Sequence, residues 1–199
     1  MADLDGLRIA PAAHLADAMD AASAATSGTV SLREIAFAVQ LGLRAHPESA
    51  SARALSASLG VPLPRQVGHV SGDPGAVHII WISPDEFLAV DTSRRRQPDE
   101  AAVAEAALRE LPGQVVDLSA NRAILELTGI HARDVLEKGC RADLHPRAFS
   151  VGSAWTTQLA QVPLILHHAG ENSYRLFPRA SFADYTVRWL IDAMAEYAV

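Results

Sequence analysis

The stretch that decides the fold is Val115 to Arg141, VVDLSANRAILELTGIHARDVLEKGCR. Its first apolar residues predict a strand over 113–118, and the polar residues that follow predict a turn over 119–121. A second strand is predicted over 122–128, because alternating apolar and polar side chains are typical of a half-buried strand. The stretch therefore begins as two strands joined by a short polar turn.

The second of these strands is more apolar than simple alternation requires. Its inward face is expected to carry Ala123, Leu125 and Leu127, and its outward face Arg122 and Glu126. Ile124 breaks the alternation. We therefore expect that the face carrying Ile124 is covered too.

A short helix over 130–138 is predicted after the second strand. Ala132, Val135 and Leu136 recur at the i, i+3, i+4 spacing of one helix face. Gly139 follows the last turn, where a left-handed residue often closes a helix. The whole stretch therefore predicts strand, turn, strand and helix.

The residues before this stretch predict an alternation of strands and helices. The predicted strands are 35–43, 77–82, 86–90 and 113–118, and the predicted helices are 49–59 and 98–111. The residues expected on the inward face of the second helix are Val103, Ala107, Leu108 and Leu111. A surface loop rich in proline is predicted over 61–75. The order β-α-β-β-α-β is that of a split βαβ, or ferredoxin-like, unit.

The residues after the stretch predict a second unit. Three strands are expected over 153–159, 162–167 and 173–177. The predicted fold class is therefore α+β, with two packed ferredoxin-like or split βαβ units and mainly antiparallel sheets. The predicted division is an N-terminal arm over 1–29, with a short helix over 12–22, then a first α+β unit over 30–114 and a second over 115–199.

The C-terminal helix has an unusually narrow polar face. Ser181 is expected to cap it, with Asp184 three residues further on as in a capping box. The charged residues recur at every fourth position, and they are Asp184, Arg188, Asp192 and Glu196. Two interpretations remain: the helix is buried in its own unit, or another subunit covers part of its surface.

Composition excludes several classes of function. The net charge of −6 gives a nucleic-acid-binding role no electrostatic basis. One cysteine, Cys140, allows no internal disulfide and suits a reducing compartment. The acidic start of the chain lacks an apolar signal core, and no apolar run is long enough to span a membrane. We therefore expect a soluble cytoplasmic protein that binds neither nucleic acid nor membranes.

Three groups of residues are candidates for chemistry, and each has a structural alternative. His167 and His168 are adjacent on a predicted strand, so they point to opposite faces and are poorly placed to share a metal ion. Cys140 could be a nucleophile, but no base is implied, and a small packed side chain is favoured. The run Arg94 to Arg96 could hold an anion or an acidic partner, and a solvated turn is favoured.

The organising stretch resembles the folate-binding domain of the glycine-cleavage aminomethyltransferases. The resemblance rests on Asp117-Leu118-Ser119, on 125–129, and on Ala132 and Val135-Leu136. Over 30–199 the chain resembles the gamma-subunit family of heterotetrameric sarcosine oxidases. The further segments that carry this likeness are Ser31 to Glu34, Pro84 to Leu88, Gly139-Cys140, Asp143-Leu144, Phe149, Val151-Gly152, Ser173 to Arg175 and Ser181-Phe182.

The resemblance implies a subunit rather than a catalyst. In the aminomethyltransferase family a carboxylate lies in the strand near the folate, and the matching position here is Val162 or Pro163, neither of which can ionise. The chain also ends before the portion that completes that family's folate site. The implied role is a non-catalytic subunit, with no catalytic, cofactor-binding or metal residue of its own. The complex would demethylate sarcosine oxidatively with O2 and tetrahydrofolate, giving glycine, 5,10-methylenetetrahydrofolate and H2O2.

The same resemblance implies partners and cofactors. The partners would be alpha, beta and delta subunits, which would bind FAD, FMN, NAD, zinc and tetrahydrofolate. Two alternatives remain: a stand-alone folate-dependent one-carbon protein, or a subunit of a related N-methyl amino acid oxidase or dehydrogenase.

Overall fold

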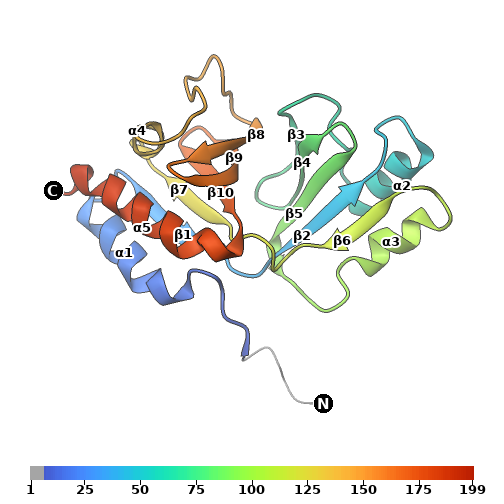
Figure 1. Cartoon of the computed structure of the whole chain (residues 1–199), viewed down its shortest axis with the longest axis horizontal. Helices are drawn as coiled ribbons and strands as arrows, with labels where there is room; N and C mark the ends of the chain where they lie inside the picture. Colours follow the sequence, from blue (N-terminus) through green and yellow to red (C-terminus); the bar gives the residue numbers. More distant parts are fainter. Residues whose placement is uncertain (1–6) are drawn as a thin grey trace.

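The computed structural model describes residues 7–199, which form two antiparallel five-stranded sheets (Figure 1). The first six residues of the predicted N-terminal arm lie outside the described residues. Sheet A has the order β1-β7-β10-β9-β8, and its strands are β1 (Ser31–Glu34), β7 (Leu125–Thr128), β10 (Ser173–Pro178), β9 (Val162–Gly170) and β8 (Ala154–Leu159). Sheet B has the order β3-β4-β5-β2-β6, and its strands are β3 (Val70–Gly72), β4 (Val77–Ser83), β5 (Glu86–Arg95), β2 (Ala38–Arg44) and β6 (Gln114–Asp117).

Sheet B confirms the predicted ferredoxin-like order. Strand β2 leads through α2 (Ala50–Leu59) to the β4–β5 hairpin, and α3 (Ala102–Leu108) leads on to β6. Strands β5 and β6 flank β2, so each helix crosses over one intervening strand. The predicted loop over 61–75 also contains β3, which extends the sheet beside β4.

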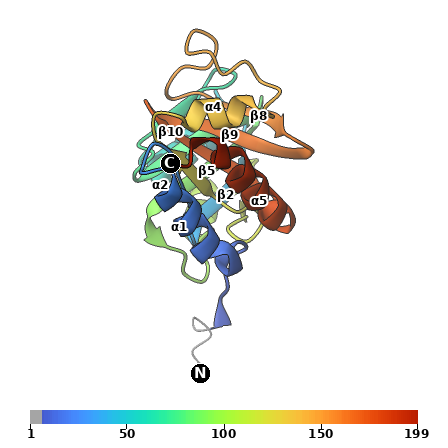
Figure 2. The same ribbon diagram turned by 90° about the vertical axis from the view of Figure 1, so that its left-hand side faces the viewer.

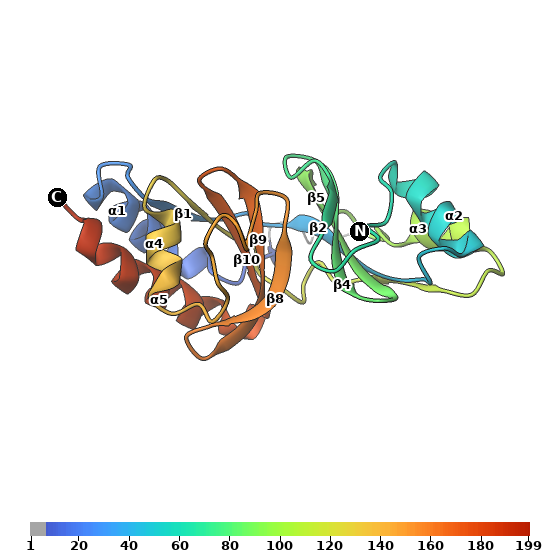
Figure 3. The same ribbon diagram turned by 90° about the horizontal axis from the view of Figure 1, so that it is seen from above.

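The two sheets face each other, and the helices cover their outer faces (Figure 3). Helices α2 and α3 lie on sheet B. Helices α1 (Ala16–Ala25), α4 (Ala132–Glu137) and α5 (Ala183–Met194) lie on sheet A. The side chains packed between the sheets are mainly aliphatic, and they include Ala38, Ile80, Leu88, Val90, Ile124, Ala154, Ile165 and Phe177. Burial of Ile124 in this layer confirms that both faces of β7 are covered.

The predicted strand over 35–43 begins three residues too early, because the chain passes from one sheet to the other over residues 35–37. Strand β1 ends at Glu34 in sheet A, and β2 begins at Ala38 in sheet B. Phe37 lies between them with φ +61°, a conformation that no strand contains. The apolar alternation continues through the segment because Ile35 packs into the layer between the sheets, whereas Val39, Leu41 and Leu43 pack into the core beneath α2 and α3.

The predicted division of the chain does not follow the sheets. Strand β1 lies within the predicted first unit, yet it pairs with β7 of sheet A. Helix α1, from the predicted arm, packs Met19 into the core of sheet A, and the 3-10 turn just before it packs Leu15 there. The helix lies alongside α5, as Figure 2 shows. Residues 35–37 therefore join two units. The unit around sheet A is formed by both ends of the chain, and the unit around sheet B is formed by its middle.

Three local predictions also differ from the structure. Helix α3 begins only at Ala102, and Val103 is 73% exposed, because Asp99 has φ +61° and breaks the predicted first turn. No side chain caps α5, which follows a 3-10 turn over Ala180–Phe182 that contains Ser181. Gly139 is not left-handed. A Cβ there would lie 2.5 Å from the Trp189 ring, so close packing requires this glycine.

Gly129 ends β7 in a conformation that no other residue adopts without strain. Its φ is +117°, and an added Cβ would lie 2.3 Å from the Thr29 carbonyl oxygen. We expect Gly129→Ala to lower the free energy of unfolding by about 3 kcal/mol or more, since backbone strain and a clash add. Gly152→Ala is the matched control, because Gly152 also has positive φ (+83°) but open space around its Cβ position. Urea denaturation of both variants checks the difference, and equal losses would contradict it.

Candidate functional site

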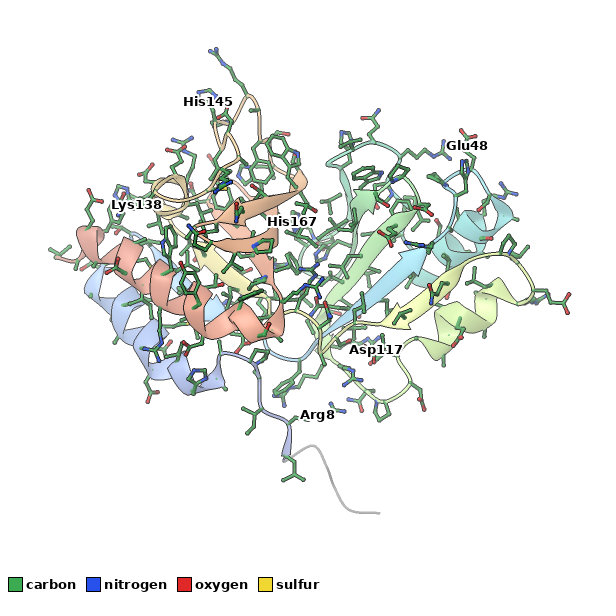
Figure 4. The ribbon with its side chains drawn as sticks, in the orientation of Figure 1. Arg8, Glu48, Asp117, Lys138, His145 and His167 are labelled. Atoms are coloured by element: carbon green, nitrogen blue, oxygen red, sulfur yellow. The ribbon has the colours of Figure 1, made fainter. Side chains whose placement is uncertain are left out.

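The Asp117-Leu118-Ser119 segment forms the junction where the chain passes from sheet B back to sheet A. The Asp117 carboxylate accepts hydrogen bonds from the Ser119 backbone N–H (2.9 Å) and the Arg96 guanidinium (2.7 Å). The Ser119 hydroxyl accepts one from the Gln40 backbone N–H (3.0 Å). Burial alone would raise the pKa of Asp117, but these hydrogen bonds outweigh it and hold that pKa below its ordinary value. Asp117 lies where the ribbon leaves β6 (Figure 4). The family motif thus has a structural function at the junction.

A cleft of about 400 Å³ opens between the sheets beside this junction, and we call it the inter-sheet cleft. Its floor is formed by β2, β5 and β6 of sheet B, and Ile165 on β9 and Arg122 close its other side. Most of its lining side chains are aliphatic or aromatic, namely Leu43, Ile82, Phe87, Leu88, Val116, Leu118 and Ile165. Its one carboxylate, Glu86, pairs with the Arg44 guanidinium. The cleft is therefore apolar, with one half-buried cation, Arg122, on its wall.

Arg122 and Arg179 lie next to each other, although 57 positions separate them. They form an isolated antiparallel bridge where sheet A begins. Arg122 donates to the Phe177 carbonyl oxygen (3.0 Å), and neither arginine has a carboxylate partner within residues 7–199. Burial and the charge of Arg179 lower the pKa of Arg122. Sequence reasoning missed this pair, since no spacing rule connects the two positions.

The arginine run at the end of β5 is mostly neutralised within the chain. Arg94 makes a two-pronged pair with Glu100 (2.6 and 2.7 Å) and also contacts Asp91 (2.9 Å). Arg96 pairs with Asp117, and the Arg95 guanidinium lies 4.9 Å from the centre of the Phe37 ring. Two of the three arginines of the predicted anion site are therefore already paired.

The adjacent histidines point to opposite faces of β9, as expected. His168 stacks on Tyr174 on the helix side (4.5 Å between ring centres) and bonds the Phe149 carbonyl oxygen (2.9 Å). His167 faces sheet B and lies 5.3 Å from the ring of His78 (Figure 4). Within residues 7–199, no group of three or more His, Cys, Asp or Glu is placed to hold a metal ion.

A row of charged side chains crosses sheet A on the face that meets sheet B. Glu126 on β7 pairs with Arg33 on β1 and with Arg175 on β10, which lies 3.0 Å away. The Arg175 guanidinium also donates to the carbonyl oxygen of Pro74 in sheet B's β3–β4 loop. The alternating pattern over 122–128 predicted that Glu126 faces outward, but sheet B covers that face of β7 and buries the side chain.

The remaining predicted positions lie around the same strands. Cys140 is half-buried, with its Sγ 4.0 Å from the Thr157 hydroxyl. Pro163 lies on the same face of β9 as Ile165 and His167, next to the inter-sheet cleft, and Val162 is buried on the other face. No helix in the described part of the chain is long and apolar enough to cross a membrane.

Known proteins are similar to this chain over nearly its whole length. It is 51% identical over 198 residues to the sarcosine oxidase subunit gamma of Corynebacterium sp. (strain U-96), covering 100% of this chain and 95% of that protein. It is 52% identical over 195 residues to the subunit gamma of Arthrobacter sp., covering 96% of this chain and 92% of that one.

Solved structures agree with the sequence comparisons. A chain of the heterotetrameric sarcosine oxidase from Corynebacterium sp. U-96, in complex with pyrrole 2-carboxylate, superposes with a TM-score of 0.90 at 51% identity and 97% coverage of both chains. The aminomethyltransferase T of the glycine cleavage system from Bartonella henselae superposes with a TM-score of 0.62 at 17% identity, over 85% of this chain and 48% of that one. The second likeness shows a shared fold. The family profile of the sarcosine oxidase gamma subunit matches residues 42–196, so the chain belongs to the sarcosine oxidase gamma subunit family.

Proposed function

We propose that this chain is the non-catalytic gamma subunit of a cytoplasmic heterotetrameric sarcosine oxidase. The observation that carries the proposal is the full-length likeness to one chain of a heterotetrameric sarcosine oxidase, with 51% identity and a TM-score of 0.90. Its partners would be alpha, beta and delta subunits. Those subunits would bind FAD, FMN, NAD, zinc and tetrahydrofolate for the oxidative demethylation of sarcosine. This chain would support the assembly.

The chemistry of the buried carboxylates favours a structural role for this chain over a catalytic one. The buried carboxylate of Glu126 is held between two arginines, and Asp117 is fixed by Ser119 and Arg96. A general acid or base must be able to reach a substrate. These two carboxylates cannot, because hydrogen bonds and ion pairs within the chain already occupy their oxygens. Beside the inter-sheet cleft, β9 presents Pro163 and Ile165, so the position matched to the aminomethyltransferase carboxylate offers no acid.

Co-purification tests the proposal directly. The full chain, tagged in its native host, should bring down larger subunits as a yellow flavin-containing complex that oxidises sarcosine. Assays with other N-methyl amino acids would reveal a related oxidase instead. An isolated chain that is a stable monomer and itself binds tetrahydrofolate or oxidises sarcosine would contradict the proposal.

Substitution of the one cysteine tests the absence of a catalytic nucleophile. We expect complexes carrying Cys140→Ala to keep kcat and KM for sarcosine within about twofold, since Cys140 only packs beside Thr157. Steady-state kinetics of the purified complex checks this expectation. A loss of kcat of a hundredfold or more, with the complex intact, would place Cys140 in the chemistry.

A further inference from the structure

The structure contains two neighbouring cations without an internal counter-charge. Arg122 and Arg179 lie side by side, and none of the carboxylates in residues 7–199 forms an ion pair with either. Other arginines at the sheet junction are paired, as Arg96 is with Asp117. A half-buried guanidinium beside a like charge is unfavourable unless an anion from outside compensates it. This pair is therefore complementary to a carboxylate.

The surface next to these arginines is apolar and open. Arg122 forms part of the wall of the inter-sheet cleft, whose floor carries Val116 and Leu88. The apolar side chain of Val116, on β6, is 40% exposed and faces this cleft. Among the described residues, 7–199, strand β6 pairs with β2 alone, so its other edge keeps backbone N–H and C=O groups that no strand of this part of the chain pairs. Edges of this kind accept a further extended segment from another chain.

We propose that the inter-sheet cleft docks a segment of a neighbouring subunit, which inserts an apolar side chain and pairs a carboxylate with Arg122 and Arg179. The inference rests on the proposed function, which supplies the neighbouring subunits. A peptide segment fits better than a free small anion, because the apolar floor and the open edge of β6 lie beside the arginines. At the end of β5, by contrast, Arg94 and Arg96 are paired with carboxylates, which leaves Arg95 as a single cation that stacks on Phe37.

Charge reversal at the exposed arginine tests the docking site. Arg179→Glu removes no hydrogen bond described within the chain and leaves the Arg122 bond to Phe177 in place. In the tagged full chain, expressed in the native host, we expect it to reduce recovery of the larger subunits about tenfold, which corresponds to about 1.4 kcal/mol. The difference in recovery between this variant and the unchanged chain should become smaller when the wash contains more salt, since salt screens both the attraction of the arginine and the repulsion of the introduced glutamate.

Two further variants separate docking from folding. Val116→Glu places a negative charge in the cleft at an exposed position, and it should reduce recovery similarly. Arg147→Glu is the matched control, since it makes the same charge change in an exposed loop next to His145, remote from the junction (Figure 4). It should leave recovery unchanged. Circular dichroism of each purified variant confirms that the fold is retained.

The outcomes distinguish this inference from the proposed function. If the unchanged chain brings down no other subunit, the proposed function fails. If it brings down the complex and Arg179→Glu and Val116→Glu do so equally well, only the docking site is overturned. If Arg179→Glu instead abolishes self-association of the isolated chain, measured by ultracentrifugation, the occupant is a second copy and the proposal is again overturned.

Discussion

Between pH 7 and pH 4.5 the chain should lose about 5 kcal/mol of its free energy of unfolding through two histidines, His78 and His167. Burial lowers the pKa of His78 from 6.5 to about 4, and the nearby charge of Arg175 adds to this effect. Burial lowers the pKa of His167 to about 3, with His78, Arg175 and His168 contributing. Both rings lie between the sheets, 5.3 Å apart, and three of their four nitrogens have no hydrogen-bond partner.

The sign of the effect follows from which state binds the proton. Below pH 6.5 the unfolded chain protonates both histidines, while the native chain keeps them neutral until the pH approaches 4 and 3. Their stabilising contribution is therefore complete above pH 6.5 and is lost as the pH falls. At pH 4.5 each histidine costs about 2–3 kcal/mol, because one unit of pKa corresponds to roughly 1.4 kcal/mol. The sum is comparable with the whole stability of a typical domain.

A double variant isolates these two groups from the carboxylates that titrate in the same range. The pH dependence should become flatter by about 5 kcal/mol in His78→Leu/His167→Leu, measured by urea denaturation at pH 7 and pH 4.5. His145→Leu, in an exposed loop, is the matched control and should keep the steep dependence. Identical profiles for the double variant and the unchanged chain would mean that both rings are already protonated or hydrated in the native state.

Much of the fold can be predicted from local pattern, because each sheet has its own core. The β4–β5 hairpin, α2 and β8 to β10 all lie close to their predicted positions. The misplaced start of the strand predicted over 35–43 has a physical cause: alternation of apolar residues indicates that one face is buried, but it does not indicate which core buries that face. Only the positive φ of Phe37 marks the change of sheet, and aromatic residues seldom adopt that conformation.

The interior charges and the inter-sheet cleft could not be predicted from the sequence. Glu126 is one of the polar residues that alternate with apolar ones along β7, a position that would normally face solvent. It is buried because sheet B covers that face of the strand. Its partner Arg175 is 49 positions away, as Arg179 is 57 positions from Arg122. Strand register brings such residues together, and local periodicity contains no information about register between distant strands.

Loss of the Glu126 carboxylate should be among the most destabilising single changes in sheet A. Glu126 and Arg175 are each 8% exposed and lie 3.0 Å apart, and Glu126 is the only carboxylate that contacts Arg175 within residues 7–199. In Glu126→Gln the Arg175 charge stays buried without a counter-charge. We expect a loss of about 3–5 kcal/mol in the free energy of unfolding at pH 7, measured by urea denaturation.

The charged row of Arg33, Glu126 and Arg175 predicts that loss of its central member costs more stability than loss of either neighbour. A general packing defect would not produce this difference. Arg175→Met leaves Glu126 paired with Arg33, so it should cost less than Glu126→Gln. Arg33→Gln, at a side chain that is 68% exposed, should cost less than about 1 kcal/mol. The double variant Glu126→Gln/Arg175→Met removes both buried charges, and its loss should be smaller than the sum of the two single losses. Additive losses would mean that solvent already screens the pair, and Arg175 would then join the sheets only through its bond to Pro74.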